Sequence, residues 1–177
     1  PIGGPYESQL ETLVMVDIRQ TDDRLVLEET VCSIESEGPS SLIETTYPAA
    51  FVDAMSGRER TAELAFDAGR FVYREPKSYR TSGVELEDPA SDELPSRPDD
   101  PRVRDPDGDG RPGLTVEVTG FVNGQVFMVQ KGWSELEGQI RSARQIEGRV
   151  RWDSDQSVID ATHRFLTHPP VSPPHPD

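Results

Sequence analysis

Apolar residues at every second position are the feature that most constrains this chain. Within Ser8–Arg19, one face of an extended chain would collect Leu10, Thr12, Val14, Val16 and Ile18. A period of two predicts a strand. A second run of β-forming residues follows at Leu25–Ile34, after the turn-forming Thr21-Asp-Asp23. The two runs therefore predict a hairpin of long antiparallel strands, which is common in barrels and strongly twisted sheets.

The same strand pattern continues through most of the remaining chain. One short helix is predicted at Ala49–Met55, because Pro48 precedes it and proline favours a first helical turn. Asn123-Gly124 predicts a type I′ hairpin turn between two strands. Further strands are predicted at Thr61–Phe66, Arg70–Arg74, Ser78–Leu86, Leu114–Val122, Gln125–Gln130, Trp133–Arg141, Gln145–Trp152 and Ser157–Phe165. Helix is the alternative for 157–166.

The sequence also predicts the local surroundings of two glycines, two tryptophans and the one cysteine. Gly138 and Gly148 lie inside strand runs and predict bulges or bends, as barrels use to curve. Cys32 lies in an apolar run and is predicted to be a buried small hydrophobe. Trp133 and Trp152 favour core or barrel-end packing, with the floor of a ligand pocket as the alternative.

A long irregular segment interrupts the strands between residues 87 and 113. It contains nine acidic residues and six prolines. Structureless loops beyond about 12–15 residues tend to be functional or disordered. A calcium ion at the C-terminal end of this segment would give it a reason to be ordered.

The end of this segment has the spacing of a calcium loop. Asp105, Asp107 and Asp109 alternate, and Gly110 follows at the sixth position. Calcium takes six to eight oxygen ligands, and loops of this kind supply them from positions 1, 3, 5 and 7 with glycine at 6. The backbone carbonyl of Arg111 is the expected position-7 ligand. The alternative is an acidic turn that binds no ion.

These nine residues resemble the loops of EF-hands, dockerins, thrombospondin type 3 repeats and FG-GAP repeats. The resemblance implies a bidentate glutamate at position 12, where Val116 stands, and Glu117 is one residue late. If Val116 packs inward on a strand, Glu117 points to the other face. Another carboxylate is then needed, and Asp99 and Asp100 are the nearest candidates.

Composition excludes several classes of partner. The chain has 177 residues, 33% of them hydrophobic, with 33 acidic and 18 basic residues and a net charge of -15. Such a surface repels phosphates, so neither nucleic acid nor an anionic membrane is an expected partner. No apolar run approaches the roughly 18 residues of a membrane helix.

Export is the expected localisation, to the extracellular space or the periplasm. Calcium loops of this type are useful where calcium is millimolar, which means outside the cytoplasm. The sequence begins at Pro1 without a methionine, which is interpreted as a processed form with its signal peptide removed. One cysteine forms no internal disulfide and does not report on the compartment.

No catalytic signature is present, so an enzyme is not expected. The chain contains no Gly-x-Ser-x-Gly, phosphate loop or His-Glu-x-x-His motif. The three histidines, His163, His168 and His175, lack zinc spacing. Glu28 and Glu29 are adjacent and would point to opposite faces of a strand.

These patterns predict an all-β fold, an antiparallel meander barrel of about eight to ten strands. It resembles the lipocalin-like group in strand number and length. One domain is expected over 1–167, with the acidic loop at 87–113, and a proline-rich tail over 168–177. The predicted function is a calcium-stabilised barrel that binds a small apolar ligand or serves as a structural module. The alternative is a subunit of a surface or periplasmic assembly that docks onto a protein partner through the acidic loop and the tail.

Overall fold

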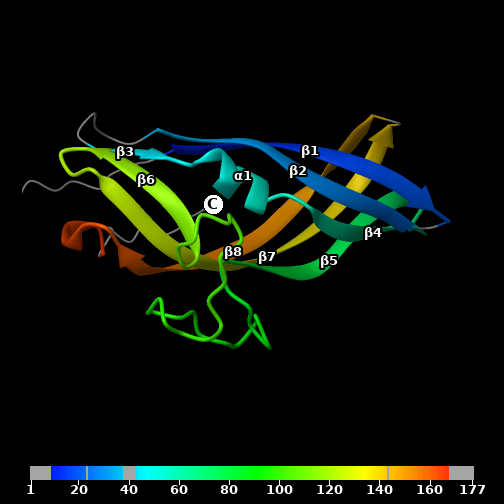
Figure 1. Cartoon of the computed structure of the whole chain (residues 1–177). Coiled ribbons are helices and arrows are strands. Elements are labelled where there is room, and N and C mark those ends of the chain that lie inside the picture. The colour runs from blue at the N-terminus through cyan, green and yellow to red at the C-terminus, as the bar shows by residue number, and fades with distance from the viewer. Residues whose placement is uncertain (1–8, 23, 38–42, 143, 168–177) are drawn as a thin grey trace, which may run out of the picture.

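The computed structural model describes residues 9–22, 24–37, 43–142 and 144–167, so the predicted tail at 168–177 lies outside the described residues. These residues form one antiparallel sheet with one short helix (Figure 1). In chain order the elements are β1 (Gln9–Thr21), β2 (Arg24–Glu37), β3 (Ile43–Thr46), α1 (Ala49–Ala54), β4 (Arg58–Asp67), β5 (Arg70–Ser82), β6 (Leu114–Gly120), β7 (Gly124–Ser142), β8 (Gln145–Ala161) and the 3-10 turn η1 (Arg164–Leu166).

Strand β7 organises the sheet because three strands pair with it. β8 runs along one edge of β7 for nearly its whole length. The other edge is shared, since β6 pairs with residues 124–128 and β5 with residues 130–139. From β5 the sheet continues through β4 and β2 to β1, and from β6 it continues to β3.

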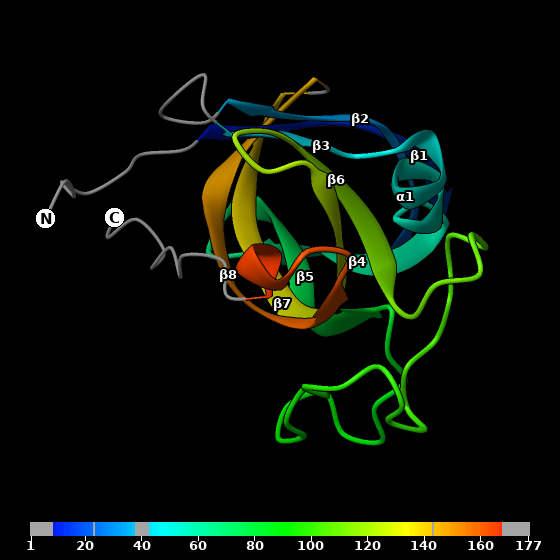
Figure 2. The same ribbon diagram turned by 60° about the vertical axis from the view of Figure 1, so that its left-hand side comes forward.

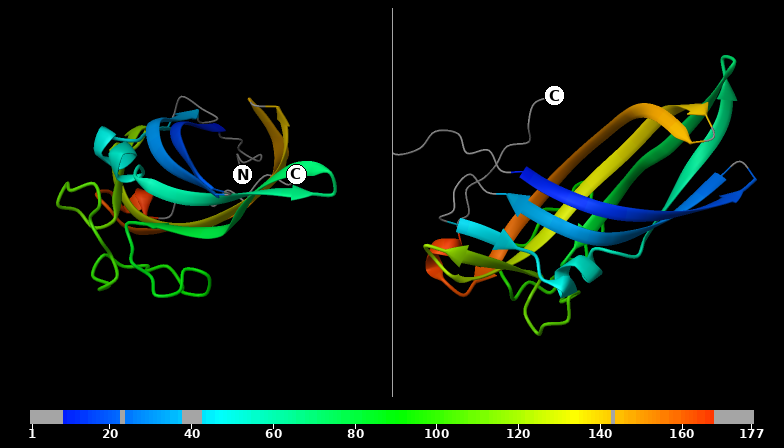
Figure 3. Two further views of the ribbon diagram at one scale, coloured as in Figure 1. Left: turned by 90° about the vertical axis from the view of Figure 1, so that its right-hand side faces the viewer. Right: turned by 90° about the horizontal axis from the view of Figure 1, so that it is seen from above.

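The prediction of an all-β antiparallel fold is confirmed, but the sheet does not close into a barrel. Among the described strands, β1 pairs only with β2 and β8 only with β7. The sheet is strongly curved, and an end-on view shows the opening between β1 and the β7–β8 hairpin (Figure 3). The order also departs from a strict meander, because β2 pairs with β4 and β5 with β7.

Two apolar clusters lie on the concave face of the sheet. At one end, Phe51 of α1 packs against Leu114, Val116 and Met128. Towards the other end, strands β2, β4 and β5 contribute Leu27, Ala62 and Tyr73. Helix α1 therefore supplies the apolar cover at the end where β6 and β3 complete the sheet.

The turn between β6 and β7 differs from the predicted Asn-Gly turn. The hairpin itself is present, but Val118 pairs with Gly124, so residues 119–123 form the connection. The positive φ falls on Gly120, at 124°, and the Asn123 side chain accepts a hydrogen bond from the Gly120 amide. Gly124 is needed for a different reason, because a Cβ there would lie 2.7 Å from Thr162 Oγ1.

Bulges also lie elsewhere than predicted. Gly138 and Gly148 pair directly with each other, and the register of β7 and β8 shifts near residues 127 and 140 instead. The two predicted strands at Arg70–Arg74 and Ser78–Leu86 are one strand, β5, with an irregularity between Glu75 and Ser78. Pro76, which lacks an amide hydrogen, lies at that irregularity.

Two side chains lie in surroundings different from those predicted. Cys32 is exposed, because the β1–β2 register shifts there and Val31 takes the buried position. Trp152 is 62% exposed, so core packing is wrong for this residue. Residues 157–161 continue β8 as a strand, and only a short 3-10 turn follows.

The Gly138–Gly148 pair should be required for β7 and β8 to lie together. A methyl group at Gly148 would overlap the backbone of Glu137 and Gly138. We expect Gly148→Ala to lower the free energy of unfolding by about 1–3 kcal/mol, as other overpacking substitutions do, measured by urea denaturation. Gly132→Ala is the matched control, since its Cβ would lie 3.0 Å from the Asp153 carbonyl. An equal loss in both variants would contradict this explanation.

Candidate metal centre

The long acidic loop leaves the sheet at the end of β5 and returns at the start of β6 (Figure 2). Gly83 and Gly113 lie at its two ends, and both lie against the Met128 carbonyl of β7. Both have positive φ, 73° and 81°, and a side chain at either would collide with this backbone. The Arg104 amide donates to the Gly83 carbonyl, and the Gly113 amide donates to the Arg104 carbonyl. The two ends of the loop are therefore fixed at one point on β7.

A third apolar cluster lies between this loop and the outer face of the sheet. Val84 and Val103 form an isolated β-bridge within the loop. Three further side chains are partly buried against this cluster, namely Leu86, Leu94 and Val103. The buried members of this cluster are Val84, Phe127, Val129 and Ile159. The irregular segment is therefore a folded structure that is packed on β7 and β8.

The three aspartates of the predicted calcium loop lie together in this structure. One carboxylate oxygen from each of Asp105, Asp107 and Asp109 falls within 4.8 Å of the others. Asp105 and Asp109 are exposed and Asp107 is half-buried. Grouped carboxylate oxygens are the ligands that hard cations prefer. This group could hold a metal ion.

Hydrogen bonds from the loop itself orient two of the carboxylates. Asp105 accepts from the amides of Gly108 and Gly110, at 2.8 and 3.0 Å. Asp109 accepts from the Arg111 amide at 2.7 Å. Gly108 and Gly110 both have positive φ, which turns the loop around Asp105. The carboxylates are therefore held in place by the backbone and not only by their position in sequence.

Asp107 is the exception within this arrangement. Its Oδ2 accepts a hydrogen bond from the Thr115 amide at 2.8 Å. Its Oδ1 is buried and has no hydrogen-bond partner among the described residues. Burial raises the pKa of Asp107, the Thr115 hydrogen bond opposes this, and the neighbouring Asp105 and Asp109 carboxylates raise the pKa further. A buried acceptor without a donor is costly, and a bound cation would offset that cost.

Thr115 connects the aspartates to β6, and sequence reasoning missed it. Besides its amide bond to Asp107, its hydroxyl donates to Asp109 Oδ2 at 2.6 Å. The residue is 3% exposed, so these bonds lie at the junction of loop and sheet. The sequence does carry a sign of this role, because Thr115 is a polar residue between the apolar Leu114 and Val116 at the start of the strand.

The start of β6 also places the residues at the twelfth and thirteenth positions of the motif. Val116 is buried and Glu117 is exposed on the opposite face, as the sequence predicted. Neither belongs to the aspartate group. The Arg111 side chain lies over the Phe127 ring, 5.7 Å from its centre. The role of the Arg111 carbonyl as a ligand stays a prediction.

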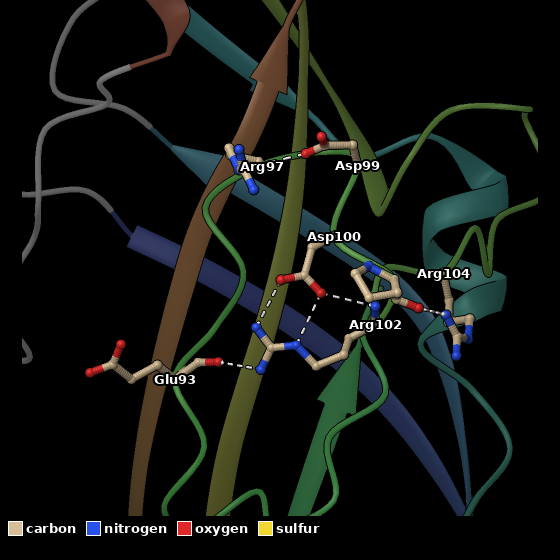
Figure 4. A network of polar contacts seen from close by, with 7 residues as sticks. Glu93, Arg97, Asp99, Asp100, Arg102 and Arg104 are labelled. Atoms are coloured by element: carbon tan, nitrogen blue, oxygen red, sulfur yellow. Dashed lines mark hydrogen bonds and ion pairs between the residues drawn. The ribbon is translucent and has the colours of Figure 1, made fainter.

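Asp99 and Asp100 are held by arginines and lie outside the aspartate group (Figure 4). Asp100 forms a two-pronged pair with Arg102 at 2.9 and 3.0 Å, and Asp99 lies 3.6 Å from Arg97. Arg102 also donates to the Glu93 carbonyl. Hydrogen bonds from the Arg102 side chain and amide lower the pKa of Asp100 to about 2. In this structure Asp100 joins two parts of the loop through Arg102, whereas Asp99 makes only an exposed ion pair.

A second polar cluster lies on the concave face and was not predicted. Arg60 donates to Glu29 at 2.6 Å and to Glu75, which also accepts from the Tyr73 hydroxyl. The side chains of Arg60, Glu29 and Glu75 are only 13%, 16% and 5% exposed. Glu28 is exposed on the other face, as expected for adjacent strand residues. One arginine between two carboxylates is an ion-pair network, which explains the burial of these charges without a catalytic role.

The Arg102–Asp100 pair makes a pH-dependent contribution to the loop. The pKa of Asp100 is depressed, so its contribution to stability is present above the ordinary range near pH 4 and is lost as pH falls towards 2. We expect Arg102→Met to raise this pKa towards its ordinary value, measured by NMR titration of the carboxyl group. Arg97→Met is the control and should raise it far less. A low pKa that persists in Arg102→Met would contradict the assignment.

In comparisons with known proteins, no family model matches the chain, and no curated protein and no solved structure matches it. Across the described residues, every helix is too short or too polar to span a membrane.

Proposed function

We propose that this chain is a non-enzymatic calcium-binding domain in which the ion stabilises the junction between the acidic loop and the sheet. One observation carries the proposal. Asp107 Oδ1 is buried without a hydrogen-bond donor in the described structure, next to two further carboxylates. An ion that contacts this oxygen would provide the missing partner. The same carboxylate accepts a hydrogen bond from the Thr115 amide, so an ion bound to Asp107 would also stabilise the start of β6.

The ligand atoms favour calcium among the metal ions. The group contains only carboxylates, without histidine or cysteine, and oxygen ligands suit hard cations. Calcium accepts irregular coordination by six to eight oxygens, whereas magnesium demands a near-ideal octahedron. The alternating aspartates with Gly110 match the spacing of calcium loops. The Arg111 carbonyl and water are expected to complete the shell.

The ion would act by removing electrostatic repulsion. Three carboxylates within 4.8 Å of one another repel when no cation is present. The raised pKa of Asp107 is a consequence of its burial and of this repulsion. The concentrations at which such loops bind calcium, about 10⁻⁴–10⁻³ M, are reached outside the cytoplasm, so export to the periplasm or the extracellular space belongs to the same proposal.

Calcium should raise the melting temperature by a few degrees. At millimolar calcium and a dissociation constant of about 10⁻⁴–10⁻³ M, native-state binding adds about 0.5–1.5 kcal/mol. For a chain of this size, each kcal/mol corresponds to roughly 2–4 °C. Isothermal titration of chelator-treated protein should show one site. No heat at millimolar calcium would refute the proposal.

Asp107→Ala should abolish this rise, and Asp99→Ala should not. Both substitutions remove one carboxylate from the same loop, so they change the net charge equally. Asp99 lies with Arg97 and outside the aspartate group, which makes it the matched control. Melting curves would be measured by circular dichroism with calcium and with chelator. Equal loss of the calcium effect in both variants would indicate diffuse charge screening and not a site.

A second candidate function is the binding of a small apolar molecule on the concave face. Large hydrophobic side chains there are 48–67% exposed. They surround the cluster of Leu27, Ala62 and Tyr73 on the same face, as the strand register shows. Exposed apolar patches of this kind mark interaction sites. The residues are Ile18, Phe66, Phe71, Ile146, Val150 and Trp152.

An apolar ligand on this face should change the fluorescence of Trp152. In a Trp133→Phe background, Trp152 is the single emitting tryptophan, and a bound fatty acid should shift its emission to shorter wavelength. Val150→Gln should weaken binding several-fold because it places an amide on this face. Arg151→Gln, the neighbouring residue on the opposite face, is the control. Unchanged emission at saturating fatty acid would eliminate this candidate.

A further inference from the structure

Strand β1 is an unprotected edge of the sheet. It pairs only with β2 in the described part of the chain, so the backbone groups along its other edge have no strand partner. All 13 of its residues are exposed except the half-buried Val16. On its outer face Leu13 and Met15 are 60% and 54% exposed. Edge strands that remain single usually carry charged side chains, proline or bulges. β1 contains neither lysine nor proline, and its outer face carries charges only at Glu11, Asp17 and Arg19, which flank the apolar Leu13 and Met15.

Strand β8, which like β1 and β3 pairs with only one described strand, carries charged side chains of this kind along its middle. Its outer face presents alternating charged residues through the middle of the strand, namely Arg149, Arg151, Asp153 and Asp155. Arg151 is already paired with Glu135 at 2.7 Å. A two-fold pairing centred on β8 would place Asp153 opposite its own copy, and like charges directly opposite are destabilising. The two edges therefore differ in their suitability for pairing.

We propose that the chain forms a two-fold symmetric dimer in which β1 pairs antiparallel with β1 of a second copy. The register is centred on Met15, so that each Met15 lies opposite its mate and all 13 residues of β1 are paired. This register places Glu11 of each copy opposite Arg19 of the other, on the outer face. On the concave face it places Val14 opposite Val16. Opposite charges and apolar residues in directly facing positions are pairs that stabilise sheets. The remaining central pairs, Thr12 with Ile18 and Leu13 with Asp17, bring no like charges together.

The charges on β1 select this register over its neighbours. Within the monomer Glu11 faces Glu35 across the β1–β2 ladder, so its only strand neighbour has the same charge. Arg19 has only a loose contact with Glu59, at 3.7 Å, with both side chains more than 60% exposed. Centring the dimer on Val14 would bring Glu11 opposite Asp17. Centring it on Val16 would leave Glu11 opposite Thr21 and without a cation.

The dimer would place the concave faces of both copies on one side of a continuous sheet. An antiparallel two-fold axis at Met15 is perpendicular to the sheet, so the concave faces of both copies lie on the same side of the combined sheet. The pairing uses the edge of β1 and leaves the aspartate group of the acidic loop free. It therefore depends neither on calcium nor on an apolar ligand.

Sedimentation equilibrium tests the proposal with a charge exchange. At physiological ionic strength, where the Debye length is about 8 Å, the net charge of -15 is largely screened and the native chain should sediment as a dimer, with calcium or with chelator. Glu11→Arg and Arg19→Glu should each weaken dimerisation about tenfold or more, because each places like charges opposite one another twice. The double variant Glu11→Arg/Arg19→Glu should restore dimerisation. Both residues are exposed, so melting curves should confirm that all three variants fold.

Site-specific oxidation tests the register independently. In a Cys32→Ser background, Met15→Cys should form a disulfide-linked dimer, since residue 15 faces its mate across the axis. Thr21→Cys, at the end of the same strand, should not form one. A monomeric native chain, a double variant no better than either single variant, or equal crosslinking at positions 15 and 21 would overturn the proposal. Assemblies larger than a dimer would overturn it as well, because they indicate an open β1-to-β8 pairing.

Discussion

The whole structure depends on the division of one edge of β7 between two strands. β5 pairs with that edge up to Gln130, and β6 pairs with it from Met128 backwards. The chain must therefore leave the sheet after β5 and return to nearly the same point to begin β6. Gly83 and Gly113 make this crossing because only glycine fits against the Met128 carbonyl in these backbone conformations. Because its two ends are adjacent, the segment between them folds as a separate unit that packs on β7 and β8 and does not extend the sheet.

The concave face is covered at the end of β7 that pairs with β6 and is open at the end that pairs with β5. Where β6 and β3 complete the sheet, α1 inserts Phe51 and the cluster is buried. Towards the hairpin ends of β1–β2, β4–β5 and β7–β8 no helix covers the sheet, and side chains such as Phe66 and Trp152 stay exposed. Between the two ends lies the ion-pair network of Arg60. The charged network therefore separates an apolar end that α1 covers from one where large apolar side chains are exposed.

The acidic loop contains two groups of carboxylates, one paired with arginines and the other clustered together. Arg102 and Arg104 each pair with a carboxylate, Asp100 and Glu85 respectively, and these pairs hold the body of the loop. The three clustered aspartates have no such partner within ion-pair distance in the described structure and receive amide and hydroxyl donors instead. Donors of this kind orient carboxylates without neutralising them. The loop therefore orients these three carboxylates without a positively charged side chain beside them in the described structure, and the group could hold a metal ion.

Local pattern accounts for the elements of this fold and for its candidate metal centre. Period-two alternation predicted β1 and β2 and their hairpin, and Pro48 predicted the start of α1, because these features act over a few residues. The spacing of Asp105, Asp107 and Asp109 predicted that their carboxylates meet, since a tight glycine-containing loop brings alternate side chains together.

Only the tertiary structure decided which strands pair and what each polar residue contacts. The β5–β7 pairing joins residues 48 to 67 positions apart, and no local signal distinguishes it from a β5–β6 pairing. One bulge in the β1–β2 ladder turned Cys32 outward. Asp100 pairs with Arg102 because the loop folds back on itself, and Thr115 meets the aspartates because Gly113 fixes the start of β6. The sequence by itself therefore determined the strands and the acidic loop, whereas long-range backbone pairing decided the open sheet and the partners of each charge.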